Sequence, residues 1–182
     1  MTRPIAKPLT LTSPRKRGEG TPRRARSVKR RGRMGSNDDP MSVAFAEARE
    51  AEQRGETPIG AALARDGVVI ASAGNRPRGD SDPTAHAEMV VLRAAAAKLG
   101  EHRLTDCDLY VTLEPCAMCA GAISHARLRR LYYAAPDPKG GAVEHGPRFF
   151  SQPTCLHAPE VYGGIRESEA AAMLRAFFAA RR

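Results

Sequence analysis

The chain has 182 residues, 42% of them hydrophobic, and 29 lysines and arginines against 20 acids give a formal net charge of +9. That length is enough for one domain with a full core, and no apolar run approaches the roughly 20 residues of a membrane span. Four cysteines and no secretory h-region argue against a disulfide scaffold and predict a cytoplasmic protein with reduced thiols.

The positive charge belongs to the amino terminus. Residues 1–35 contain 12 basic residues and one acid, whereas the other 147 residues contain 17 basic and 19 acidic residues. We predict that residues 1–36 form a disordered basic tail, because without hydrophobic periodicity they cannot offset the entropy of ordering. An RNA-contacting arm, a targeting presequence and a misassigned start remain open, and we favour the misassigned start or an inert tail. Residues 37–182 are predicted to form one domain.

That domain is predicted to begin with a helix and a hairpin. The stretch 37–40 offers capping acids and a first-turn proline to a helix from about Met41, which ends at Gly55. Its expected apolar face consists of Val43, Phe45, Ala46 and Ala48. Strands at 59–64 and 68–73 flank Asp66-Gly67, a dipeptide typical of two-residue hairpin turns.

The rest of the domain alternates helices with strands. Thr84 is the predicted cap of a helix over 85–99 that ends at Gly100, and Pro115 opens a short helix. The other expected elements are strands at 109–113, 128–135 and 160–162, a Gly/Pro-rich passage at 136–159 and a helix from 167 to the end. This order predicts an α/β fold with three layers, α/β/α, around a central mixed sheet. Its sites are expected at strand-to-helix corners.

Two short motifs suggest a metal site. His86 and Glu88 lie in one, and Cys116 and Cys119 in the other. One imidazole and two thiolates suit zinc and leave a fourth position for water. A redox pair, half of a structural zinc site, or two buried thiols are the alternatives. A structural site needs a fourth protein ligand, and the nearby histidines His102 and His125 lack ligand spacing.

Glu88 lies only two residues after His86 in the sequence, which argues against its being a fourth ligand of the same metal ion. A carboxylate beside zinc-bound water can carry protons, so we predict that Glu88 is the general acid/base. The alternative is an acid that stabilises the amino end of a helix. The order H-x-E, then P-C-x-x-C, is the signature of zinc-dependent nucleobase deaminases.

Residues 41–182 resemble bacterial tRNA-specific adenosine deaminases of the cytidine-deaminase-like superfamily. The matching passages are Thr57-Pro58-Ile59-Gly60-Ala61, Gly74-Asn75-Arg76, Pro83-Thr84-Ala85-His86-Ala87-Glu88, Tyr110-Val111-Thr112-Leu113-Glu114-Pro115-Cys116, Cys119-Ala120-Gly121-Ala122, Asp137-Pro138-Lys139 and Phe177-Phe178. The resemblance implies a cytidine-deaminase-like fold and a homodimer with one Zn²⁺ per subunit. It also implies hydrolytic conversion of adenosine to inosine at the wobble position of a tRNA anticodon.

The same resemblance implies a set of substrate contacts. Asn75 would bind the flipped nucleoside, although a turn residue closing a strand is an equally good interpretation from the residues alone. Asp137 would contact a neighbouring ribose. Adjacent aromatics cannot both face one core, so one of the terminal pair is expected to be exposed. The implied substrate-binding residues are Asn75, Ala87, Asp137, Phe177, Phe178 and Arg181.

Two rival functions remain. A free nucleobase or nucleoside deaminase of the guanine or cytosine type could use the same fold and zinc site, and would act without RNA. A non-catalytic, zinc-stabilised binding module would not need Glu88. Between Gly140 and Gly164 the sequence departs from the commonest family pattern, with Leu156 where many relatives have a polar side chain.

Overall fold

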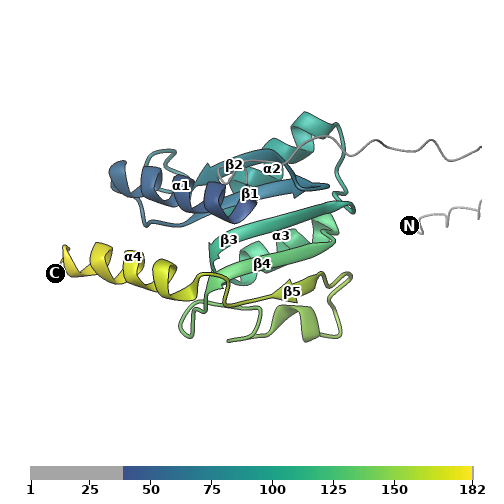
Figure 1. The fold of residues 1–182 in the computed structure, drawn as a ribbon. Coiled ribbons are helices and arrows are strands. Elements are labelled where there is room, and N and C mark those ends of the chain that lie inside the picture. The colour runs from purple at the N-terminus through teal and green to yellow at the C-terminus, as the bar shows by residue number, and fades with distance from the viewer. Residues whose placement is uncertain (1–38, 182) are drawn as a thin grey trace, which may run out of the picture. The chain divides into compact units, whose positions relative to one another are not determined.

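The computed structural model describes residues 39–181, and the predicted tail at 1–36 lies outside the described residues. Helices, strands and one 3₁₀ turn alternate along the described part (Figure 1). In chain order they are α1 (Pro40–Gln53), β1 (Gly60–Arg65), β2 (Val68–Gly74), α2 (Ala87–Leu99), β3 (Cys107–Leu113), α3 (Ala117–Ala126), β4 (Arg130–Ala135), η1 (Phe149–Ser151), β5 (Glu160–Tyr162) and α4 (Glu167–Ala179). Within residues 39–181, no helix combines the length and apolarity needed to cross a membrane.

The five strands form one mixed sheet in the order β2-β1-β3-β4-β5. β1 pairs antiparallel with both β2 and β3, whereas β3–β4 and β4–β5 are parallel. Parallel neighbours end at the same edge of a sheet. The residues that follow β3, including Cys116, are therefore brought close to those that follow β4, including Asp137.

Helices cover both faces of this sheet, which confirms the predicted three-layer architecture. Side chains alternate across a strand, so Leu109 joins the cluster that contains Val91 of α2 and Ile123 of α3. The opposite cluster contains Phe45 of α1 and Ala170 of α4. In Figure 1, α1 lies in front of the sheet, α2 and α3 lie behind it, and α4 extends to the left beyond the strands.

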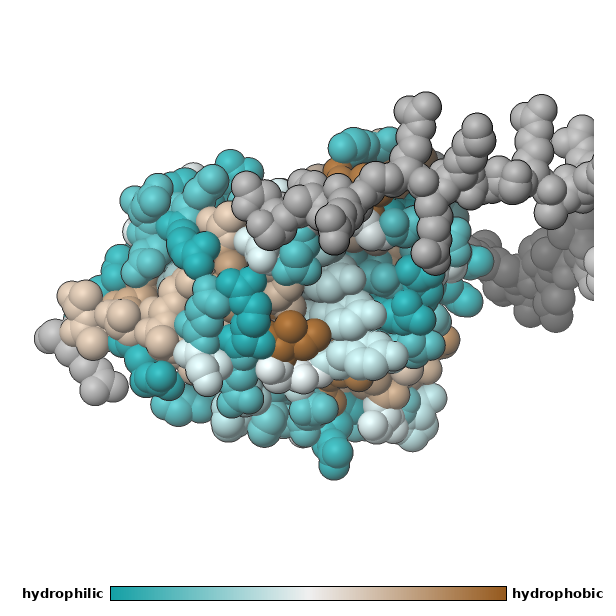
Figure 2. Space-filling view, viewed as in Figure 1, coloured by the Kyte–Doolittle hydropathy of each residue, from teal (hydrophilic) through white to brown (hydrophobic). Residues whose placement is uncertain are grey.

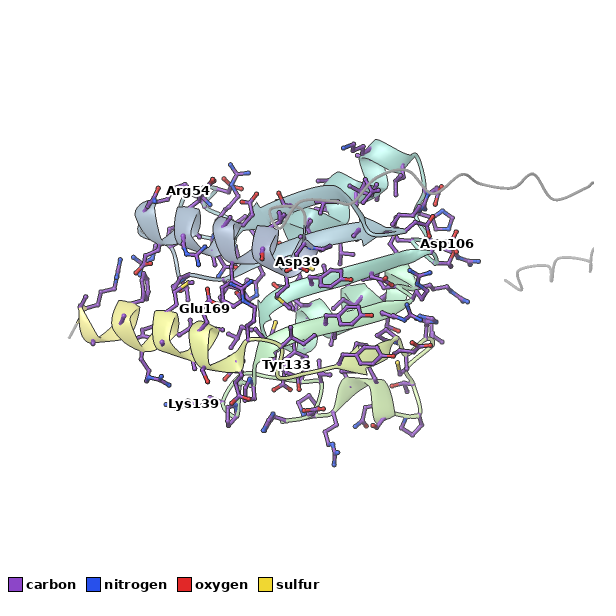
Figure 3. All side chains as sticks on the ribbon, viewed as in Figure 1. Asp39, Arg54, Asp106, Tyr133, Lys139 and Glu169 are labelled. Carbon is purple, nitrogen blue, oxygen red and sulfur yellow. The ribbon has the colours of Figure 1, made fainter. Side chains whose placement is uncertain are left out.

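An exposed ion pair and a contact between a cation and a buried ring link the start of α4 to α1. Arg49 of α1 donates to Glu169 of α4 at 2.9 Å, and Figure 3 shows Glu169 between these helices. Both partners are more than a third exposed, and such surface pairs contribute only about 0–1 kcal/mol. The Arg166 guanidinium lies 4.2 Å above the ring of Phe45, which is completely buried.

The hairpin was predicted correctly, and two local predictions were wrong. Asp66 and Gly67 have φ of 52° and 78°, as a turn with two left-handed residues requires. Thr84 does not cap α2, because its hydroxyl group donates to Asp82 at 2.7 Å and the N-cap is His86. Ala46 is exposed rather than on the apolar face of α1, since the buried stripe has helical spacing and consists of Met41, Ala44, Phe45, Ala48 and Ala51.

Candidate active site

His86 is held at the point where the loop after β2 enters α2. As the N-cap it has extended backbone angles, and its own side chain does not cap the helix. The cap comes from Asn75, at the end of β2, whose Oδ1 accepts from the backbone N–H of Ala87 at 2.8 Å. Both Asn75 and Ala87 are buried. Asn75 thus fixes the residue next to His86 while its amide NH₂ group remains to donate elsewhere.

The two cysteines meet His86 from the first turn of α3. Cys116 is the N-cap of α3 and Cys119 follows one turn later, completely buried. Their sulfur atoms lie 3.7 and 3.6 Å from His86 Nδ1. Among residues 39–181, this is the one group of three or more such side chains close enough to hold a metal ion.

The separations fit a tetrahedral zinc centre. Zn–N and Zn–S bonds of about 2.0–2.1 and 2.3 Å at tetrahedral angles require an N–S separation of about 3.6 Å. The two measured Nδ1–Sγ distances agree with that value. One imidazole with two thiolates is also a donor set that zinc prefers. The chain therefore offers three candidate ligands close enough together to hold one ion, and three protein ligands are typical of catalytic zinc sites.

The two thiols of this site differ in pKa: that of Cys116 is lowered, whereas the hydrogen bond to Cys116 and burial raise the pKa of Cys119. Hydrogen bonds from the Cys119 thiol and from His86 lower the pKa of Cys116 to about 4, against the opposing effect of burial. The hydrogen bond to Cys116 in turn raises the pKa of His86. Cys116 also lies at the amino end of α3, where unpaired N–H groups favour an anion.

Glu88 lies beside the ligands in the first turn of α2, with only 4% of its surface exposed. Burial raises the pKa of Glu88, because removal from water penalises the charged carboxylate. A raised pKa makes a carboxylate a stronger base, which helps it to accept a proton from water before passing that proton on. Its burial beside three metal-type ligands favours the proton-carrying role over that of a surface acid stabilising the helix.

A pocket of about 950 Å³ adjoins this site and contains Asp137, Phe178 and Arg181. His86, Glu88 and the two cysteines do not line it, but Ile59 does, and the carbonyl oxygen of Ile59 accepts from the N–H of Asn75 at 2.9 Å. Figure 2 shows weakly hydrophobic surface over α4. The remaining lining residues are Thr57, Leu113, Pro136, Lys139, Gly140, Leu174, Arg175 and Ala179.

The terminal aromatics separate as adjacency predicts. Phe178 is 52% exposed and lines the pocket, whereas Phe177 is 4% exposed. The guanidinium of Arg181 lies 3.5 Å from the centre of the Phe177 ring and donates to the carbonyl oxygen of Phe177. Phe178 is thus the ring available to a ligand, and the Phe177 ring is covered by protein.

Two buried carboxylates that organise the loops around the site were not found from the sequence. Glu56 is 5% exposed and accepts from the backbone N–H groups of Arg78 and Gly79 at 2.9 and 2.8 Å. Glu114 is 2% exposed and binds the loop after β4. Burial would raise the pKa of Glu114, but hydrogen bonds from the N–H groups of that loop lower it to about 2. For Glu114, its position directly before Pro115 was the sequence feature that could have drawn attention to it.

The fold and the three-ligand site define a class of deaminases. Residues 34–135 match the family model described as the cytidine and deoxycytidylate deaminase zinc-binding region, so the chain belongs to that family. The tRNA-specific adenosine deaminase of Agrobacterium fabrum is 63% identical over 142 residues, which cover 78% of this chain and 93% of that protein. Within the class, the chain therefore belongs to the tRNA-specific adenosine deaminases.

Solved structures agree with this assignment. One from a study of A-to-I editing by tRNA:A34 deaminases at the wobble position of transfer RNA has 64% sequence identity and a TM-score of 0.73, covering 74% of this chain and 98% of that one. A guanine deaminase from Nitrosomonas europaea has 25% identity and a TM-score of 0.68, covering 80% and 86%. The second likeness shows that related folds occur in enzymes acting on a free base, so substrate choice depends on the site.

Proposed function

We propose that this chain catalyses the hydrolytic deamination of adenosine to inosine at the wobble position of a tRNA anticodon. The observation that carries the proposal is the juxtaposition of the three ligands and buried Glu88 with a pocket containing Asp137 and exposed Phe178. The 63% identity to a tRNA-specific adenosine deaminase supports it. Free-base deamination of the guanine or cytosine type is the alternative.

The proposed chemistry assigns one role to each group. His86, Cys116 and Cys119 would hold a single Zn²⁺ per chain, which when bound lowers the pKa of water to about 7 and supplies a nucleophile at neutral pH. Glu88 takes a proton from the attacking water and delivers it to adenine N1, and then carries the second proton to the departing amino group. Adenosine and water thereby become inosine and ammonia.

The remaining polar groups have atoms free for the nucleotide. Asn75 Oδ1 is occupied by the N–H of Ala87, which leaves its NH₂ group to donate to the flipped nucleoside. Ala87 is buried and its N–H donates to Asn75, so its contribution is to hold the Asn75 side chain in place for the nucleoside. Asp137 Oδ1 accepts from Lys139 and Gly140, and Oδ2 remains to accept from a ribose hydroxyl group. Contacts to a 2′-OH distinguish RNA from DNA.

The proposal extends to a homodimer in the cytoplasm, where a tRNA-modifying enzyme would meet its substrate. The dimer is what the resemblance to tRNA-specific adenosine deaminases implies, and Leu156, which is 74% exposed, is a candidate residue for its interface. A second copy would remove this large apolar side chain from water. The mass in solution, measured by light scattering, would be that of one chain if the dimer does not form.

The decisive experiment compares substrates with the zinc-loaded full chain. An anticodon stem-loop with adenosine at the wobble position should be converted to inosine, whereas free adenosine, guanine and cytosine should be turned over far more slowly. The reason is that the pocket beside Asn75 can bind neighbouring nucleotides, which a free base lacks. Efficient turnover of a free base with none on the stem-loop would replace the RNA proposal by the alternative.

Replacing Phe178 should weaken RNA binding without affecting the chemistry. Stacking of a base on an aromatic side chain contributes about 1–3 kcal/mol, so Phe178→Ala should raise KM for the stem-loop about 5- to 150-fold. The matched control is Val68→Ala, at a similarly exposed apolar residue at the start of β2 outside the pocket. Equal KM values for the two variants would remove Phe178 from the RNA-binding surface.

A further inference from the structure

Glu114 is the centre of a hydrogen-bond network that the proposed chemistry does not use. Its Oε1 accepts from the backbone N–H groups of Val143, Glu144 and His145 at 3.1, 2.8 and 3.0 Å. Its Oε2 accepts from the N–H of Asp137 at 3.0 Å and lies 2.7 Å from Nδ1 of His145. The side chain is completely inaccessible to solvent. One carboxylate therefore anchors both ends of the loop 137–145.

This network connects the metal-ligand cluster with the pocket that contains Asp137. On one side, Glu114 is separated from the metal ligand Cys116 only by Pro115, whose carbonyl oxygen accepts from the N–H of Ala142 at 2.9 Å. On the other side, Glu114 holds the backbone of Asp137, which lines the pocket. Tyr133 adds a further tie, since its hydroxyl group donates to Glu144; Figure 3 shows Tyr133 on β4 and Lys139 on the loop after it.

The loop approaches Glu114 so closely that a side chain would not fit between them. A Cβ atom on Gly141 would lie 2.5 Å from the carboxyl carbon of Glu114 and 2.5 Å from the carbonyl oxygen of Asp137. Contacts this short do not occur with real Cβ atoms, so the glycine permits the approach. The loop is thus built around the carboxylate.

We propose that Glu114 is a positioning residue that fixes Asp137 relative to His86, Cys116 and Cys119. An RNA bound through Asp137 then presents its adenosine at the metal site. The inference rests on the proposed function, because it takes Asp137 as an RNA contact. Glu114 itself touches neither substrate nor metal. Its effect is exerted through the loop, and the loop's effect through Asp137.

Glu114→Gln separates this role from simple packing. The amide has nearly the same shape and keeps one acceptor oxygen, but its NH₂ group cannot accept from another N–H. One set of loop contacts is then lost, either at Asp137 or at residues 143–145. Asp108→Asn is the matched control: Asp108 is also a buried acid, but it lies at the start of β3, whereas Glu114 directly follows the end of that strand, and it pairs with Arg129.

The first measurement is hydrogen exchange of the zinc-loaded full chain, which needs no substrate. In Glu114→Gln, amides of the loop 137–145 should exchange at least tenfold faster than in the wild type, while those of β1 and α2 remain unchanged. In Asp108→Asn the loop should exchange at the wild-type rate. Unchanged loop exchange in Glu114→Gln would overturn the proposal, whatever the activity.

The second measurement tests whether Glu114 acts through Asp137. On the stem-loop, Glu114→Gln should raise KM about tenfold with a smaller change in kcat and full zinc content. Asp137→Ala should raise KM similarly, and the double variant should show no further increase, because both changes remove one interaction. Multiplicative effects, or a wild-type KM in Glu114→Gln, would overturn the inference. Failure of the wild type itself on the stem-loop would instead reject the proposed function, and the exchange experiment would still decide the role of Glu114.

Discussion

Glu88→Gln should reduce kcat on the anticodon stem-loop by about 10²–10⁴-fold, the usual cost of losing one general acid/base. Glutamine preserves the length and shape of the side chain but cannot carry a proton. KM should change little, because Glu88 acts on the reacting atoms and does not bind the rest of the RNA. Initial rates and metal analysis of the same preparation would measure both quantities.

The thermal stability of Glu88→Gln provides a second, independent test. Glu88 is 4% exposed and burial raises its pKa, so the folded protein disfavours the charged form of Glu88. A neutral amide avoids that penalty, and Glu88→Gln should unfold at or above the wild-type temperature. Asp108→Asn, which removes a buried carboxylate remote from the site, should instead lower stability and spare kcat. Near-wild-type kcat in Glu88→Gln would refute the proton-carrying role.

Features that depend on neighbouring residues in the chain could be predicted from the sequence. The hairpin at Asp66-Gly67 follows from two residues that tolerate positive φ, and the end of α2 at Gly100 follows from the same preference. The cluster of His86, Cys116 and Cys119 could be predicted because these side chains have few other uses at that spacing, and the structure brings them together; their role as zinc ligands stays a prediction. Helix–strand alternation gave the three layers, although it could not give the strand order.

Contacts between distant segments were beyond the reach of sequence patterns. Thr84 was the obvious local cap for α2, yet the N-cap is His86, and the N–H of Ala87 is bound by Asn75, which directly follows β2 twelve residues earlier. The partners of Glu114 lie 23 to 31 residues further along the chain. No periodicity encodes such pairs, because they depend on two strands ending at the same edge of the sheet. The predicted tail at 1–36 stays a prediction.

In the terminal helix, the sequence pattern could not decide which of two adjacent aromatic residues is exposed. Adjacency required that one of Phe177 and Phe178 be exposed, but not which. The choice follows from helical spacing, because Phe177 lies seven residues after Ala170, which packs in one cluster with Phe45, and the two therefore share the buried face of α4. That orientation turns Phe177 inward under Arg181 and leaves Phe178 at the pocket. The resemblance implied RNA contacts for both rings, and the structure favours Phe178 for direct stacking.

Removing the two thiolates should have the largest effect of all. Cys116→Ala combined with Cys119→Ala leaves His86 as the one remaining member of the cluster, and a single imidazole cannot hold zinc tightly. Metal content should fall from about one ion per chain to background, and deamination should become undetectable. The folded state also loses the stabilisation of a bound ligand, about 2.7 kcal/mol at 100 times its Kd, so the unfolding temperature should drop.

The matched control is Cys155→Ser. Cys155 is a free, half-buried thiol that contacts Ser124 and lies outside the metal cluster. This variant should keep both zinc and activity, which would show that losing a thiol does not by itself inactivate the enzyme. Each single variant, Cys116→Ala or Cys119→Ala, should lose activity almost as completely as the double, because the three ligands act as one unit. Full zinc content in the double variant would mean that the ion is bound elsewhere, and the ligand assignment would be wrong.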